Sequence, residues 1–77
     1  MKRNPKVVYA IQHELNMVRD GRQRHEAARL SKGAALAEPF ALHEAYTWDD
    51  LFVDDDRVIA EWQAALDEYE AGTEAQS

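Results

Sequence analysis

Five aspartates lie close together in the stretch TWDDLFVDDDR, which covers residues 47–57. Clustered carboxylates can bind a divalent cation, act as general acid and base, imitate nucleic-acid phosphates, or occupy the first turns of helices. An EF-hand loop requires an oxygen ligand and a glycine where this sequence has Val58 and Ile59. A general acid requires a buried carboxyl group with a raised pKa, whereas this cluster is expected to be solvated. We therefore predict neither a metal site nor catalytic residues here.

Helix capping accounts for the positions of these aspartates. Thr47, followed three residues later by Asp50, has the spacing of a capping box. Asp54 is expected to cap the last helix, which the sequence predicts from about Asp55 to Glu70. The remaining carboxylates then lie in first turns, where the helix dipole favours negative charge.

The other residues that carry chemistry in enzymes form no recognisable site. His13 and the glutamate after it begin a metalloprotease-like motif, but Met17 stands where the second histidine belongs. The sequence contains no cysteine, and its three glycines are isolated, so no phosphate-binding loop is present. A pocket large enough for a metabolite would consume most of the core of so short a chain. We predict a protein that is not an enzyme and has no cofactor.

The spacing of apolar residues predicts helices around these positions. Asn4 and Pro5 are typical of a helix start, and a stripe with helical spacing then continues to about Arg19: Val8, Ile11, Leu15 and Val18. Asp20-Gly21 is expected to end this helix. A second helix is predicted from Arg22 to Lys32, where Gly33 stops it.

Residues 34–46 are the least determined part, and Pro39–Ala45 is interpreted as a short helix of its own. The last helix has an apolar stripe made by Ile59, Trp62, Leu66 and Tyr69. Tyr9, Trp62 and Tyr69 are expected in the core, whereas some of the trio Phe40, Trp48 and Phe52 are expected to be partly exposed. The predicted fold is an all-α bundle of three principal helices plus one or two short helices. It forms a single domain over residues 1–77, with flexible ends at about 1–4 and 71–77.

Charge is distributed unevenly along the chain. Residues 1–32 carry eight bases and three acids, a net charge of +5, whereas residues 33–77 carry one base and twelve acids, a net charge of −11. Oppositely charged halves either pair inside the molecule or present two faces to two partners. No apolar run is long enough to span a membrane, and the lack of cysteine suits a reducing compartment, so we expect a cytoplasmic protein.

Two groups of residues are predicted to bind a partner. The basic group belongs to the first half of the chain and consists of Lys2, Arg3, Lys6, Arg19, Arg22 and Arg24. The second group combines aromatic anchors with carboxylates and consists of Trp48, Asp49, Asp50, Phe52, Asp55 and Asp56.

A short, cysteine-free, helical chain with the basic start MKRNPK and an acidic end resembles the host-takeover proteins of bacteriophages. In size and character it is similar to the RNA-polymerase-binding regulators of Xp10-type phages. This resemblance implies a protein of the host cytoplasm that binds bacterial RNA polymerase, inhibits sigma-dependent initiation and reads through terminators. It covers the general character of the whole chain, and no site residues follow from it.

Two alternatives stay open. An acidic chain of this size also suits a nucleic-acid mimic that inhibits a nuclease or a CRISPR effector. Such a mimic is expected to display its acids along an extended surface and has little use for a basic half. A small nucleic-acid binder that uses the basic half is the third hypothesis. HEAARLSKG, residues 25–33, is similar to the start of a helix-turn-helix, but residues 34–38 offer no side chain that reads bases, and Pro39 follows.

Overall fold

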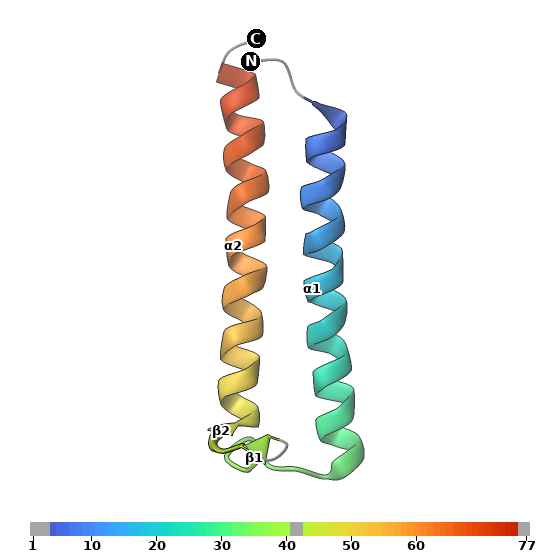
Figure 1. The fold of residues 1–77 in the computed structure, drawn as a ribbon, viewed down its shortest axis with the longest axis vertical. Coiled ribbons are helices and arrows are strands. Elements are labelled where there is room, and N and C mark those ends of the chain that lie inside the picture. Colours follow the sequence, from blue (N-terminus) through green and yellow to red (C-terminus); the bar gives the residue numbers. More distant parts are fainter. Residues whose placement is uncertain (1–3, 41–42, 76–77) are drawn as a thin grey trace.

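The protein is an elongated helical hairpin. The structure, a computed structural model, describes residues 4–40 and 43–75. In chain order it contains α1 (Pro5–Lys32), β1 (Pro39–Phe40), β2 (His43–Thr47) and α2 (Trp48–Ala75). The two helices run side by side in opposite directions, and the two strands close one end, here called the tip (Figure 1). The prediction of a mainly helical chain is therefore confirmed, but two long helices and a small sheet replace the three principal helices that we predicted.

The ends of α1 are those that its sequence indicates. The Lys6 N–H donates to Asn4 Oδ1 at 3.0 Å, and Pro5 occupies the first turn. Gly33, at φ 65°, adopts the left-handed conformation that ends the helix. The predicted break at Asp20-Gly21 is wrong, because the helix continues through both residues. A glycine inside a helix costs only about 1 kcal/mol, which the packing of α1 against α2 on both sides of Gly21 outweighs.

The tip is an irregular antiparallel β-hairpin instead of the short helix that we predicted over Pro39–Ala45. Pro39 pairs with Thr47 and Phe40 with His43; residues 41–42 of the predicted helix lie outside the described residues. The Trp48 N–H donates to the Glu38 carbonyl at 3.1 Å, and the Asp49 N–H donates to the Leu36 carbonyl at 3.0 Å. These bonds give two of the free amides at the start of α2 a backbone partner.

The start of α2 has the predicted capping box. The Asp50 N–H donates to Thr47 Oγ1 at 3.2 Å, and the Thr47 N–H donates to Asp50 Oδ2 at 3.0 Å. The second predicted cap is wrong, because Asp54 lies inside a continuous helix and its carboxylate accepts a hydrogen bond from Tyr46 at 2.6 Å. The predicted tail is also wrong for residues 71–75, which are helical. The predicted ends at 1–3 and 76–77 lie outside the described residues.

The core lies at the tip. Trp48, Leu51 and Phe52 form a buried cluster there, and the Phe40 ring meets Trp48 edge-on with centroids 4.9 Å apart. Of the three aromatic residues of which some were expected to be partly exposed, Phe40 is half-buried, whereas Trp48 and Phe52 are buried because the start of α2 directs both side chains toward α1. Tyr9, by contrast, was predicted to lie in the core and is 73% exposed.

Away from the tip, burial is thinner. Leu15 is fully buried between the helices, whereas Trp62 is only half-buried. Two helices alone can cover only one flank of each apolar stripe, so most of these side chains keep some exposure.

Candidate functional site

The two helices carry opposite charge. Six bases and three acids give α1 a net charge of +3, whereas one base and ten acids give α2 a net charge of −9. With 28 residues, α2 extends over about 42 Å. The uneven charge along the sequence thus becomes a difference in charge between two antiparallel helices. What these charges can bind depends on which of them face solvent.

Most bases of α1 are engaged within the chain. Arg22 Nε donates to Asp56 Oδ1 at 2.9 Å across the seam, and its Nη1 donates to Glu26 Oε2 at 3.0 Å. The hydrogen bond to Asp56 is the main reason that the pKa of Arg22 is raised. Arg19 donates to Gln63 of α2 at 2.9 Å, and Arg24 forms an ion pair along α1.

Three of the six predicted basic contact residues, Arg19, Arg22 and Arg24, therefore already have polar partners inside the hairpin. Lys6 is exposed at the start of α1, and no ion pair of Lys6 occurs within residues 4–40 and 43–75. Lys2 and Arg3 lie outside the described residues. The structure thus does not gather the basic group into one open patch.

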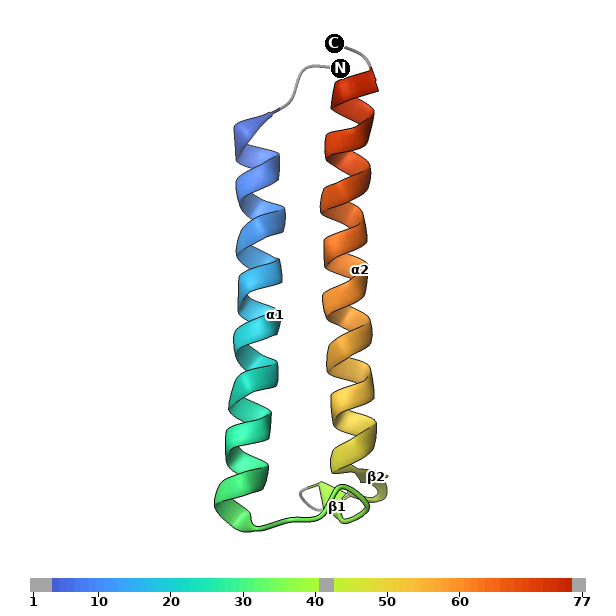
Figure 2. The same ribbon diagram turned by 180° about the vertical axis from the view of Figure 1, so that it is seen from behind.

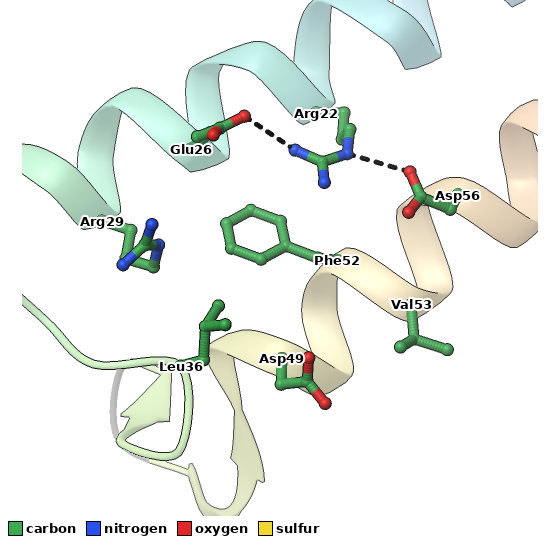
Figure 3. Close-up of a pocket in the computed structure, with 8 residues that line it drawn as sticks. All are labelled: Arg22, Glu26, Arg29, Leu36, Asp49, Phe52, Val53 and Asp56. Atoms are coloured by element: carbon green, nitrogen blue, oxygen red, sulfur yellow. Dashed lines mark hydrogen bonds and ion pairs between the residues drawn. The ribbon is translucent and has the colours of Figure 1, made fainter.

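A shallow pocket of about 280 Å³ lies beside the tip, between the two helices (Figure 3). The Arg22 guanidinium carbon lies 4.7 Å from the centre of the Phe52 ring, and that of Arg29 lies 5.9 Å from it. Cations over an aromatic face are attracted by its electrons. Three carboxylates line the same pocket, so its charges nearly balance, and the arrangement holds the tip against α1 rather than offering a site for an anion.

One atom in this pocket lacks a partner. Arg29 Nη1 donates to the Ala34 carbonyl at 3.0 Å, but Arg29 Nε is buried without a hydrogen bond. It is the single such side-chain atom in the part of the chain that the structure describes. The stacking of Arg29 on Phe52 compensates in part for this loss.

Two of the aspartates bind side chains of other elements. His25 Nδ1 and Asp55 Oδ2 lie 2.7 Å apart in the seam, and the Asp55 side chain is 18% exposed. Asp54 accepts the hydrogen bond of the Tyr46 hydroxyl, and this bond, with burial as the second cause, raises the pKa of Tyr46 to about 12. Asp55, which we predicted to bind a partner, is instead part of the packing between the helices.

The exposed carboxylates of α2 continue well beyond the predicted group. Asp49, Asp50 and Asp56 are exposed, as that prediction requires. Farther along the helix the sequence analysis missed three exposed acids, Glu61, Asp67 and Glu68. We call these six residues the acidic face. The missed signal is periodic: acids recur at an interval of seven residues at 49 and 56 and again at 61 and 68, which places the members of each pair on the same flank of a helix.

The buried aromatic residues cannot serve as anchors in this conformation. Trp48 is 2% exposed and Phe52 is 7% exposed, so neither presents a surface to a partner. The large apolar side chains that do face solvent lie elsewhere and include Tyr9, Met17, Leu30 and Val53.

Within residues 4–40 and 43–75, no group of three or more potential ligands is arranged to hold a metal ion. Neither α1 nor α2 has a stretch both long and apolar enough to cross a membrane. Comparison with protein-family models, curated proteins and solved structures finds no match to this chain.

Proposed function

We propose that the protein is a non-enzymatic binding module that docks on a larger protein through the acidic face of α2. The observation that carries this proposal is the imbalance between the helices. Most bases of α1 are engaged by partners within the hairpin, whereas Asp49, Glu61 and Glu68 are exposed and form no ion pair with any described residue. The exposed Arg57 is the single base among these acids in α2, and a surface that is predominantly of one sign steers the approach of an oppositely charged partner and sets its orientation.

The proposed partner is bacterial RNA polymerase, and the proposed effect is inhibition of sigma-dependent initiation, antitermination, or both. The choice of this enzyme rests on the resemblance of the sequence to phage regulators. The acidic face supports it in a general way, because it suits any large cytoplasmic machine with a basic surface.

A second candidate function is mimicry of a nucleic acid by an inhibitor of a nuclease or CRISPR effector. One observation favours it: the exposed acids follow a single helix from Asp49 to Glu68, over about 29 Å, instead of gathering at one point. The basic half, which counted against mimicry, is partly engaged within the hairpin, because Arg22 and Arg24 form ion pairs and Arg19 donates to Gln63. The same engagement weakens the third hypothesis, a nucleic-acid binder that uses the basic half, because engaged arginines have less to offer a phosphate backbone.

A pull-down from bacterial lysate with the tagged protein tests the proposal. The double variant Asp49→Asn/Asp67→Asn removes two exposed charges of the acidic face and should lose the retained partner, as should the parent at high salt. The control Glu14→Gln removes an exposed carboxylate from α1 and should retain the partner. Mass spectrometry then identifies that partner.

RNA polymerase among the retained proteins would support the first candidate, and a nuclease would support the second. Equal retention by the parent and by Asp49→Asn/Asp67→Asn would show that the acidic face does not dock, and it would overturn both.

A further inference from the structure

The seam between the helices divides the hairpin into two broad sides. Leu15, which is 1% exposed, marks the line along which α1 faces α2. Because a helix turns by about 100° per residue, Arg19, four residues later, lies to one side of this line. Ile11 and Val18 lie to the other side. Arg19 donates to Gln63, so we call its side the polar side and the opposite one the apolar side.

On α1, the apolar side is made mainly of β-branched and small residues. Val7, Ile11 and Val18 follow one another at spacings of four and seven, and Val7 is 37% exposed. Glu14, an exposed carboxylate, and Gly21 follow Val7 on the same flank at intervals of seven, and Ala28, the next residue of this series, packs against the buried cluster of the tip. The equivalent positions on the polar side include Gln12, Arg19 and Glu26.

On α2, the apolar side is defined in the same way. Asp56 and Gln63 reach toward α1 on the polar side. Val58 comes two residues after Asp56, and Ala65 comes two residues after Gln63. Two residues correspond to about 200° around the helix, so Val58 and Ala65 lie on the apolar side. Both are only half-buried. Figures 1 and 2 view the hairpin from its two broad sides, and no third element of the described chain covers either one above the tip.

The surface of the chain is large for its mass. It amounts to 5753 Å², whereas a compact monomer of 8.8 kDa exposes about 4,800 Å². The radius of gyration is 16.6 Å, whereas a compact chain of this length has about 11.5 Å. The excess of roughly 1,000 Å² is close to the area that one partner contributes to a standard protein interface.

We propose that a second copy of this chain covers the apolar side, so that two hairpins form a four-helix bundle. The apolar side of α1 carries no base between Val7 and Ala28, so only the net charges of the whole helices distinguish the possible arrangements. A two-fold axis parallel to the helices places each α1, with net charge +3, against α2 of the other copy, with net charge −9. A two-fold axis perpendicular to the helices would instead place the two acidic helices against each other.

Gly21 fits this arrangement. A side chain added there would meet no atom of its own chain within 4 Å, so no contact inside the hairpin requires glycine. Its backbone is helical, where glycine is unfavourable relative to alanine. Its position on the apolar side lets the backbone of a second copy approach closely.

The first test measures molar mass by light scattering and sedimentation over a concentration series. The parent should have the mass of two chains. Ala65→Glu places a charge on the apolar side and should have the mass of one. The matched control is Ala64→Glu, the same substitution at the neighbouring exposed position, which should remain dimeric. A parent that stays at the mass of one chain at every concentration overturns the proposal.

A second variant guards against a loss of folding in Ala65→Glu. Gly21→Glu adds a side chain where the hairpin has open space and improves helix propensity, so circular dichroism should show an intact helix. This variant should also have the mass of one chain. A folded Gly21→Glu protein that remains as dimeric as the parent would overturn the proposed surface.

Disulfide cross-linking tests the arrangement, since the chain has no cysteine of its own. Val18 and Ala65 lie at similar heights along the hairpin, because Arg19 bonds to Gln63. Under oxidising conditions, a mixture of Val18→Cys and Ala65→Cys proteins should form covalent heterodimers, and neither protein should cross-link alone. Cross-linking by Ala65→Cys alone would overturn the parallel axis.

The inference does not depend on the proposed function, because it rests on apolar residues. Glu61 and Glu68 of the acidic face border Val58 and Ala65 at spacings of three and four residues, but the docking variant changes Asp49 and Asp67, which lie on the polar side. The two proposals can fail separately. If the parent has the mass of one chain, and both the parent and Ala65→Glu retain a lysate partner, the docking proposal stands and the dimer is refuted. If the parent is dimeric and Asp49→Asn/Asp67→Asn retains the same proteins as the parent, the dimer stands and the docking proposal is refuted.

Discussion

His25 Nδ1 lies 2.7 Å from Asp55 Oδ2 across the seam of the hairpin. Four residues of α2 recur at intervals of seven and lie on one line along the helix: Trp48, Asp55, Trp62 and Tyr69. Asp55 is the only carboxylate among these three aromatic residues. A carboxylate in this line of aromatic residues needs a partner, because an unpaired polar group between packed helices loses its hydration without compensation. His25 and Asp55, which lie 30 positions apart in the sequence, therefore each supply the polar partner that the other needs in the seam.

This pair leads to a prediction about single and double substitutions. Asp55→Ala should lower the free energy of unfolding by about 1–3 kcal/mol, because it leaves the His25 ring without its partner. The double variant His25→Leu/Asp55→Leu should lie within about 1 kcal/mol of the parent or above it, since apolar residues can replace such a pair. Urea denaturation at neutral pH measures both. A double variant that is less stable than Asp55→Ala would contradict the prediction.

The two tryptophans should differ in their importance to stability. Trp48→Ala should cost about 3–5 kcal/mol, because it removes the centre of the buried cluster. Trp62→Ala is the matched control and should cost clearly less, because Trp62 is only half-buried. Thermal melting followed by circular dichroism compares the two. Equal losses would mean that the core extends evenly along the seam.

Tyr46 should give the protein a distinctive alkaline transition. Its neutral hydroxyl donates to Asp54, and an ionised Tyr46 would face that carboxylate, so the pKa rises from 10.0 to about 12. The stabilisation is therefore complete below pH 10 and is lost as the pH rises toward 12. An absorbance titration should show one of the three tyrosines ionising late. Tyr46→Phe should remove this step, and Asp54→Asn should move it toward lower pH.

Gly33 and Gly72 offer a comparison of the same substitution in two backbone conformations. Gly33→Ala should destabilise the protein by about 1–2 kcal/mol, because an added Cβ is strained at φ 65°. Gly72→Ala lies in α2 with open space around it and should gain up to about 1 kcal/mol. Denaturation midpoints measure the difference. A neutral Gly33→Ala would show that the left-handed turn is dispensable.

Local signals in the sequence predicted both ends of α1 and the start of α2 correctly. The cap at Asn4, the glycine stop at Gly33 and the capping box of Thr47 and Asp50 each depend on atoms within four residues of one another. Such contacts form in a similar way whatever the rest of the chain does.

The errors arose where distant residues decide the structure. Asp54 looks like a second cap in sequence, but Tyr46 binds its carboxylate and the helix continues around it. Gly21 looks like a stop, but Arg22, the next residue, bonds to Asp56 and extends the contact between the helices. The acidic face was predicted only at its beginning, because its later members become one surface only when α2 is a single helix.

The uneven burial along the hairpin has a consequence for its motions. The tip holds the buried aromatic cluster, whereas at the opposite end the Asn4 N–H reaches the Tyr69 hydroxyl at 2.8 Å on an exposed surface. Local opening requires the least free energy where few apolar contacts must break. Amide hydrogen exchange should therefore be slowest near the tip and faster toward the open end. We expect the ends of α1 and α2 that lie far from the tip to separate and come together again while the tip stays folded, without global unfolding.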